Sequence, residues 1–234
     1  MKVITASHEI LTELDRNKIL NHIENCGRQC YQSTHLVKDG SASGFVQMIM
    51  QRGHHSVIEH CSMSIKFIVD RGITHEMVRH RLASFSQEST RFCNYGGDRF
   101  GNEINVIDPC TSIELSPKMN KLTETDMQHY RHLLNVALEQ SELIYNKMID
   151  HGIPPEYARG VLPNATKASI VITANMREWR EIFSQRAVSE FAHPQIREVM
   201  IPALLEVNEY LPEIFLDLVN QLPMWVVTEY GSNM

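Results

Sequence analysis

Residues 62–70 alternate between apolar and polar side chains, and this pattern constrains the fold more than any other feature of the chain. The apolar set is Met63, Ile65, Phe67 and Val69, and the polar set is Ser62, Ser64 and Lys66. Because successive side chains of a strand point to opposite faces, the alternation predicts a half-buried strand. A β-rich run at 166–174 and short segments at 2–6 and 103–108 predict further strands.

Helical periodicity covers most of the remaining chain. The longest predicted helix spans about 122–150, with apolar residues at the spacing of one helix face. Other helices are predicted over 15–31, 43–52, 72–80 and 176–187 (the last capped by Asn175), as a short turn from Pro154 to Arg159, and near Pro194 and Pro212. Strands and helices do not alternate regularly, which disfavours a doubly wound parallel sheet. We therefore expect an α+β fold, a small and mostly antiparallel sheet surrounded by helices, in a single domain over residues 1–234.

The charge balance limits the classes of ligand. The chain has 234 residues and a formal net charge of −6, which argues against binding nucleic acid. Any anion site must therefore be local and built from a few arginines. We expect no membrane association, because no apolar run could span a bilayer and the N-terminus lacks the apolar stretch of a signal peptide. Five cysteines without a Cys-x-x-Cys pair favour reduced thiols in a cytoplasmic protein.

Histidines and acidic residues crowd the segment 54–80, which raises the possibility of a metal site. A zinc-protease helix carries His-Glu-x-x-His, with the two histidines four residues apart on one face. His75 and His80 are five apart, and this spacing turns them away from each other by roughly 140° on a helix. Two arginines flank His80 and would repel a dication, so we expect no catalytic metal.

The segment 79–91 combines cationic and hydroxyl side chains most densely. It reads Arg-His-Arg-Leu-Ala-Ser-Phe-Ser-Gln-Glu-Ser-Thr-Arg. Arg79, His80 and Arg81 are consecutive, so they cannot share a helix face and suit a helix end or a turn. The arginine fork matches phosphate, and a hydroxyl-rich loop between such forks suits a nucleotide phosphate. The alternative is a solvated basic face beside a serine-rich turn.

Ser89 closes this segment and could be read as a nucleophile. A nucleophilic serine needs an adjacent base that a third group holds in place. The neighbours of Ser89 are Glu88, Thr90 and Arg91, and no Gly-x-Ser-x-Gly elbow surrounds it. A phosphate ligand is therefore the better interpretation of Ser89.

Four blocks, in order along the chain, resemble flavin-dependent thymidylate synthases. In residues 79–91, Arg-His-Arg is followed after seven residues by Ser. Residues 54–60 have the pattern His-x-Ser-x-x-Glu-His, and residues 158–163 read Ala-Arg-Gly-Val-Leu-Pro. The fourth block, 175–186, begins with Asn-Met-Arg-Glu-Trp and ends at Arg186. The resemblance covers most of the chain and implies the fold of that family.

The resemblance also implies which residues bind cofactor and substrate. It implies that FAD contacts His54, Ser56, Arg79, His80, Arg81, Gln87, Asn175, Arg177 and Glu181. It implies that dUMP contacts Glu76, Met77, Val78, Arg79, Gln87, Glu88, Ser89, Thr90, Arg91, Arg159 and Arg186. Family members are homotetramers whose active sites form between subunits, so one site would use residues of more than one chain.

The implied reaction is reductive methylation of dUMP to dTMP. Methylenetetrahydrofolate would donate the carbon, and FAD reduced by NADPH would donate the hydride. Arg186 is the candidate catalytic residue, because an arginine facing the N3–C4–O4 region of uracil stabilises the negative charge that makes C5 nucleophilic.

Three positions depart from the commonest family pattern: Glu76, Ser86 and Gln87. They keep two alternatives open. One is a related flavin enzyme that methylates or hydroxymethylates another pyrimidine nucleotide. The other is a non-catalytic nucleotide-binding module.

Overall fold

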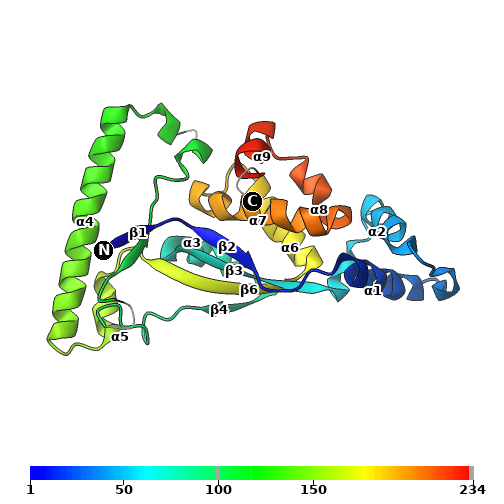
Figure 1. The fold of residues 1–234 in the computed structure, drawn as a ribbon, viewed down its shortest axis with the longest axis horizontal. Coiled ribbons are helices and arrows are strands. Elements are labelled where there is room, and N and C mark those ends of the chain that lie inside the picture. Colours follow the sequence, from blue (N-terminus) through cyan, green and yellow to red (C-terminus); the bar gives the residue numbers. More distant parts are fainter. Residues whose placement is uncertain (98–100, 117, 232–234) are drawn as a thin grey trace. The chain divides into compact units, whose positions relative to one another are not determined.

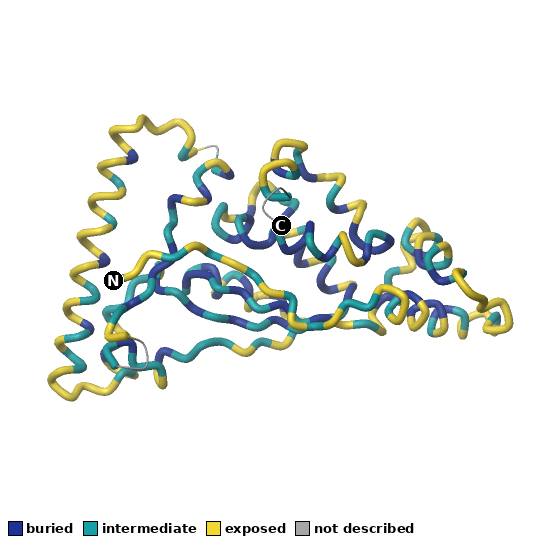
Figure 2. The backbone as a smooth tube through the Cα atoms, viewed as in Figure 1, coloured by how far each residue is buried: buried dark blue, intermediate teal, exposed yellow. Residues whose placement is uncertain are grey.

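The computed structural model describes residues 1–97, 101–116 and 118–231, and Figure 1 shows their helices and strands. Strand β3 (Ser62–Asp70) has the alternation expected from the sequence. Met63, Ile65, Phe67 and Val69 are at most 1% exposed, whereas the residues between them keep partial exposure. Figure 2 shows the same alternation of buried and partly buried positions along the central strands. The predicted strand at 62–70 is therefore confirmed.

Four strands form the main sheet in the order β2-β3-β6-β4. The partners of β3 are β2 (Ser7–Ile10) and β6 (Lys167–Asn175), and β4 (Ala83–Gln87) borders β6. A hydrogen bond of 2.7 Å joins the hydroxyls of Ser64 on β3 and Thr173 on β6. A second, parallel pair consists of β1 (Lys2–Ile4) and β5 (Asn105–Ile107). The mixed α+β class is confirmed.

The helices follow the predicted order with three differences. Their bounds are α1 (Arg16–Gln29), α2 (Ser41–Gln51), α3 (Arg71–Met77), α4 (Glu124–Asp150), α5 (Pro155–Ala158), α6 (Met176–Phe183), α7 (Pro194–Tyr210), α8 (Pro212–Val219) and α9 (Met224–Gly231). The helix predicted over 72–80 ends at Met77, and α9 was not predicted. The helix predicted over 176–187 is wrong as a continuous α-helix, because α6 ends at Phe183 and a π-helical turn, η7 (Ser184–Val188), follows it.

The chain divides into two compact units. Unit 1 comprises residues 1–7, 67–79 and 86–170, and unit 2 comprises residues 8–66, 80–85 and 171–234. The single domain expected over 1–234 stays a prediction. No helix in the described part of the chain is both long enough and apolar enough to cross a membrane.

Each unit has its own apolar core. In unit 1 the buried rings of Tyr95 and Tyr145 pack with Ile104 and Leu138, which attaches α4 to the unit. In unit 2 the Trp179 ring stacks on Phe183 at 5.4 Å, and Phe183 meets the Phe215 ring edge-on at 5.9 Å. The Trp179 indole N–H also donates to the Met63 carbonyl oxygen at 3.0 Å, so α6 is anchored on β3.

Candidate active site

The Arg79-His80-Arg81 triplet begins two residues after the end of α3. The N–H of Val78 still donates to the Thr74 carbonyl oxygen at 3.1 Å, which closes the last helical turn. His80 is buried, whereas Arg79 and Arg81 are exposed. The predicted placement of the triplet at a helix end is confirmed.

His80 and Arg186 form a partly buried contact within unit 2. The Nε–H of Arg186 donates to Nε2 of His80 at 3.1 Å. On the other side of the ring, Nδ1 lies 3.9 Å from Oε1 of Glu178. Burial, followed by the charge of Arg186, lowers the pKa of His80 below its ordinary value, and the charge of Glu181 opposes this. At neutral pH His80 is therefore neutral, with a lone pair on Nε2 for Arg186.

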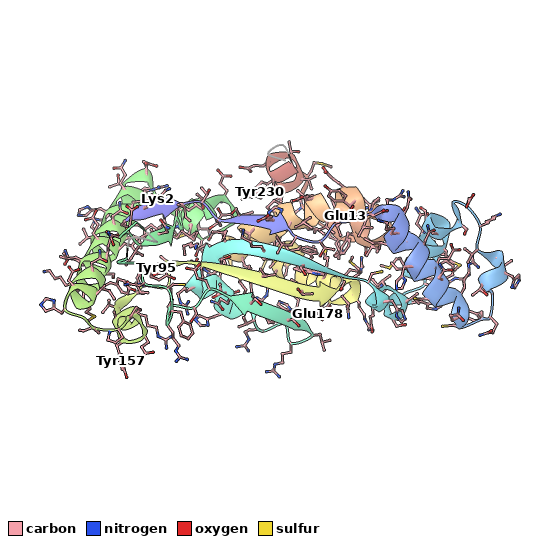
Figure 3. The ribbon with its side chains drawn as sticks, turned by 60° about the horizontal axis from the view of Figure 1, so that its bottom comes forward. Lys2, Glu13, Tyr95, Tyr157, Glu178 and Tyr230 are labelled. Atoms are coloured by element: carbon pink, nitrogen blue, oxygen red, sulfur yellow. The ribbon has the colours of Figure 1, made fainter. Side chains whose placement is uncertain are left out.

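Glu178 and Arg186 both lie in the segment that follows β6, which consists of α6 and η7. Asn175 ends β6 and caps α6, since its Oδ1 accepts the Glu178 N–H at 2.8 Å. Glu178 therefore lies in the first turn of α6, as Figure 3 shows. Arg186 lies in η7, where the Ser189 N–H donates to the Ser184 carbonyl oxygen at 3.0 Å. A π turn changes the direction of the side chains that follow it, and such turns are frequent at functional sites.

A cavity of about 710 Å³ in unit 2 collects three predicted FAD residues, Asn175, Arg177 and Glu181. Glu178 and Arg180 also line it. Arg177 pairs with Glu59 at 2.5 Å, and Arg180 pairs with both carboxylate oxygens of Asp217 at 2.6 and 2.7 Å. These side chains supply hydrogen-bond donors and acceptors around a space large enough for part of a dinucleotide.

His54 and Ser56 line a different cleft of about 570 Å³ in unit 2. The aromatic and aliphatic side chains of Phe45, Met48 and Val57 share this cleft, and Arg52 adds a cation. The chain thus does not place His54 and Ser56 in the cavity lined by Asn175, Arg177 and Glu181.

The side chains of Gln87 and Glu88 form hydrogen bonds with other residues of unit 1. Gln87 ends β4, and its side-chain N–H donates to the Thr74 hydroxyl at 2.8 Å. Glu88 accepts from the Tyr95 hydroxyl at 2.8 Å, from Lys167 Nζ at 2.7 Å and from the Ser169 N–H at 3.2 Å. The expectation of a continuous hydroxyl-rich loop is therefore wrong for residues 83–87, which form a strand.

Residues Ser89–Arg91 form a turn that meets Arg159. The Ser89 carbonyl oxygen accepts from the N–H groups of Phe92 and Cys93 at 3.1 and 2.9 Å. The Thr90 hydroxyl is buried and accepts from Arg159 Nη1 at 3.4 Å, while Arg159 Nε donates to the Glu156 carbonyl oxygen at 3.2 Å. The fold thus brings Thr90 and Arg159 together, with hydroxyl and guanidinium donors suited to a phosphate, and Arg91 follows Thr90 in the turn. Contact of these residues with dUMP stays a prediction.

The remaining predicted dUMP residues, 76–79, lie at the end of α3. Met77 is fully buried in the core, so a contact between this residue and a ligand would use its backbone. Glu76 is partly buried, while Val78 and Arg79 are exposed. The side chains available to a ligand here are therefore those of Glu76, Val78 and Arg79.

Glu178 was not among the residues predicted from the sequence. A signal was present, because an acidic residue three positions after an Asn N-cap matches the start of a capping box. In the structure the backbone of Glu178 takes part in the cap, while its side chain faces His80. The cap pattern could therefore have indicated the residue, but not its contact with a histidine 98 positions earlier.

Comparison with known proteins gives consistent matches. The model of the family described as thymidylate synthase complementing protein matches residues 14–213. A flavin-dependent thymidylate synthase of Corynebacterium efficiens is 35% identical over 202 residues, which cover 83% of this chain and 78% of that protein. A flavin-dependent thymidylate synthase of Geobacter sulfurreducens is 32% identical over 81% of this chain and 78% of its own.

Two solved structures share the fold. The UMP/dUMP methylase PolB from Streptomyces cacaoi, bound with 5-Br dUMP, has a TM-score of 0.74 and 21% identity over 99% of this chain and 98% of its own. Thymidylate Synthase X from Helicobacter pylori, with FAD and dUMP, has a TM-score of 0.66 and 19% identity over 91% of this chain and 98% of its own. At this level of identity the similarity concerns the fold.

Proposed function

The chain belongs to the flavin-dependent thymidylate synthase family, and we propose that it methylates dUMP to dTMP. The proposed carbon donor is methylenetetrahydrofolate, and the proposed hydride source is FAD reduced by NADPH. The observation that carries the proposal is the contact between Arg186 and neutral His80, whose ring faces Glu178. Glu178 lines the same cavity as Asn175, Arg177 and Glu181. The contact holds the Arg186 guanidinium and connects it, through His80 and Glu178, to a space of suitable size and polarity.

Arg186 has the central role in the proposed mechanism. Carbon C5 of uracil is a weak nucleophile until negative charge develops over N3, C4 and O4. A guanidinium facing that edge stabilises this charge, and a partly buried guanidinium does so more strongly than one in water. Because the contact with His80 uses Nε, it orients the plane of the guanidinium. Bound flavin, once reduced, supplies the hydride that completes the methyl group.

The proposed phosphate ligands of dUMP are Ser89, Thr90, Arg91 and Arg159. In unit 1 Arg159 donates to the Thr90 hydroxyl, and Arg91 Nη2 lies 4.0 Å from Glu156 Oε2. Ser89 precedes Thr90 and Arg91 in the same turn and accepts the Arg91 N–H at 3.3 Å. We propose that Glu88 supports this turn through its contacts with Tyr95 and Lys167, although the resemblance implied a direct contact with dUMP.

The side chains around the 710 Å³ cavity fit a flavin dinucleotide. Arg177 and Arg180 offer cationic donors for phosphate, and Asn175 offers an amide. We also propose the homotetramer, with active sites that use residues of more than one chain, and a cytoplasmic location.

The direct test uses the purified 234-residue chain. We expect visible flavin absorbance, a change in that absorbance on adding dUMP, and dTMP identified by mass when methylenetetrahydrofolate and NADPH are present. A protein that stays colourless and cannot be reconstituted with FAD would contradict the proposal. Omitting the folate and NADPH in turn tests each co-substrate.

Parallel assays separate the alternatives. The PolB structure concerns a methylase of both UMP and dUMP, and Glu76 and Gln87 depart from the commonest family pattern, so UMP and dCMP are tested beside dUMP. A hydroxymethylated product or a preference for another nucleotide would indicate the related enzyme. Binding of dUMP without any turnover would indicate the non-catalytic module.

A substitution of Arg186 then tests whether this residue is needed for dTMP formation. We expect Arg186→Ala to lower kcat by about 10²–10³-fold, the usual loss when a donor to a developing anion is removed. Flavin content should stay close to wild type. Arg131→Ala is the matched control, because it removes an exposed arginine from α4 and should leave kcat unchanged.

A further inference from the structure

Glu178, His80 and Arg186 form a line of three side chains in unit 2. His80 lies between the other two, with Arg186 Nε 3.1 Å from its Nε2 and Glu178 Oε1 3.9 Å from its Nδ1. The Glu178 side chain is 10% exposed and the His80 side chain is 6% exposed, so water competes little for their contact. The resemblance assigned His80 to FAD and gave no role to Glu178.

The chemistry of the three groups determines which ring nitrogen of His80 carries the proton. An arginine Nε–H is always a donor, so His80 Nε2 must accept and cannot carry a proton. A neutral imidazole then carries its proton on Nδ1, which faces the Glu178 carboxyl group. At 3.9 Å this contact is an electrostatic attraction rather than a direct hydrogen bond. A carboxyl oxygen attracts Nδ1–H whether Glu178 is ionised or protonated, so the preference does not depend on its charge.

We propose that Glu178 and His80 are positioning residues that hold the Arg186 guanidinium in its reactive orientation. Glu178 favours the Nδ1–H tautomer of His80, and Nε2 of that tautomer accepts from Arg186 Nε. This inference rests on the proposed function, because it concerns the orientation of the group that faces uracil.

The local backbone explains why Arg186 needs such a support. It lies in a π turn that ends at Val188, outside the regular hydrogen bonding of α6. A long arginine side chain also loses considerable rotamer freedom when it is held in one orientation. Besides its chain neighbours Arg79 and Arg81, the charged groups that interact with His80 in the described part of the chain include Glu178, Glu181 and Arg186, from α6 and η7. Glu181 bonds Gln185, which leaves Glu178 as the carboxyl group that faces Nδ1.

The test compares Glu178→Leu and Glu178→Gln in the 234-residue chain. Leu removes the acceptor opposite Nδ1, whereas Gln keeps a carbonyl oxygen of the same reach. We expect Leu to lower kcat for dTMP formation about tenfold with little change in KM for dUMP, since misorientation of a catalytic group affects mainly the transition state. Gln should restore at least half of the wild-type kcat.

The imidazole ¹⁵N chemical shifts of His80 give a readout that a purely structural role would not change. Wild type and Glu178→Gln should show the Nδ1–H tautomer, and Glu178→Leu should show a mixture with Nε2–H. Glu213→Gln is the matched control, because it alters another buried carboxylate of unit 2, which binds Arg16 and Ser43. It should reduce stability without changing the His80 shifts.

The outcomes separate this inference from the proposed function. Equal kcat and an unchanged tautomer in wild type and Glu178→Leu would overturn the inference alone. Absence of dTMP from the wild-type reaction would overturn the proposed function and, with it, the inference.

Discussion

At the scale of single residues, Glu88 belongs to the 79–91 motif, yet its side chain makes hydrogen bonds that stabilise the fold. Its carboxylate accepts from the Tyr95 hydroxyl, from Lys167 and from the Ser169 N–H, and only 11% of the side chain is exposed. Burial, followed by the charge of Glu88, raises the pKa of Tyr95 well above its ordinary value, so Tyr95 stays a donor at every physiological pH. Removing the Glu88 charge would leave these donors without an adequate acceptor.

We predict that Glu88→Gln lowers the free energy of unfolding by about 2–4 kcal/mol. The magnitude follows from leaving partly buried donors, one of them a lysine, imperfectly paired. Urea unfolding followed by circular dichroism measures it, and Glu139→Gln on the exposed side of α4 is the control. A loss below about 0.5 kcal/mol, the range of ordinary surface substitutions, would show that the Glu88 contacts contribute little.

The second residue-scale prediction concerns pH. Because the pKa of His80 is lower in the folded protein than its ordinary value of 6.5, the unfolded state binds the proton first as pH falls. The contribution of His80 to stability is therefore present above about pH 6.5 and is lost as pH falls through the folded-state pKa. We expect the melting temperature of wild type to fall more steeply than that of His80→Gln between pH 7.5 and 5.5. If the melting temperatures of the two proteins fell equally with pH, His80 would not be the source of the pH dependence.

The sequence predicted contacts between residues close together in the chain better than contacts between residues far apart in it. The position of Arg79-His80-Arg81 after a helix end, and the cap formed by Asn175, follow from neighbours within a few positions. The contact of His80 with Glu178 depends on how α6 packs, and no local pattern contains that information. For the same reason the sequence did not show that Glu88 would be enclosed by Tyr95 and Lys167.

At the scale of elements, the long alternating strands and the short strands β1 and β5 were predicted, whereas β2 and β4 were missed. β3 and β6 carry a continuous apolar face, which is a local signal. β2 reads Ser-His-Glu-Ile and β4 reads Ala-Ser-Phe-Ser-Gln, with little apolar content. They are strands because the sheet offers backbone partners. For example, the Glu88 N–H, just after β4, donates to the Ser169 carbonyl oxygen of β6 at 2.8 Å. Tertiary context therefore overrides weak propensity here.

The cap of α6 allows an element-scale prediction that separates folding from cofactor binding. Asn175 uses Oδ1 to accept the Glu178 N–H, while its amide N–H₂ is the proposed donor to FAD. Asp can cap equally well but has no such donor, and Ala can do neither. We expect Asn175→Ala to lower stability by about 1 kcal/mol and to lose flavin affinity, whereas Asn175→Asp loses flavin affinity with stability close to wild type.

Thermal unfolding of the apoprotein and titration with FAD measure the two effects independently. The apoprotein is necessary because bound flavin would itself raise the melting temperature. If Asn175→Asp bound FAD as tightly as wild type, the amide would not be a flavin contact. If Asn175→Ala were as stable as wild type, the cap would not contribute to folding.

At the scale of the whole molecule, the surface of α4 bears on assembly. Leu133, Val136, Leu143 and Ile144 are 55%, 46%, 46% and 42% exposed. At 100° per residue these four fall within roughly 100° of the helix circumference, so they share one face. Single exposed apolar residues are ordinary, but a row of them on one helix face is typical of a protein interface. The proposed homotetramer would cover this face with a second copy of the chain.

We predict that Leu133→Glu combined with Leu143→Glu reduces the solution mass from that of a tetramer to that of a smaller species, because charge on both partners opposes burial of the row. Asn135→Glu is the matched control, since it adds an acidic residue on another side of the same helix and should leave the mass unchanged. Sedimentation velocity gives the mass, and dTMP formation by the same samples shows whether the active site needs more than one chain. A double variant that stays tetrameric would place the subunit contacts elsewhere, and a monomeric wild type that forms dTMP would remove the need for shared sites.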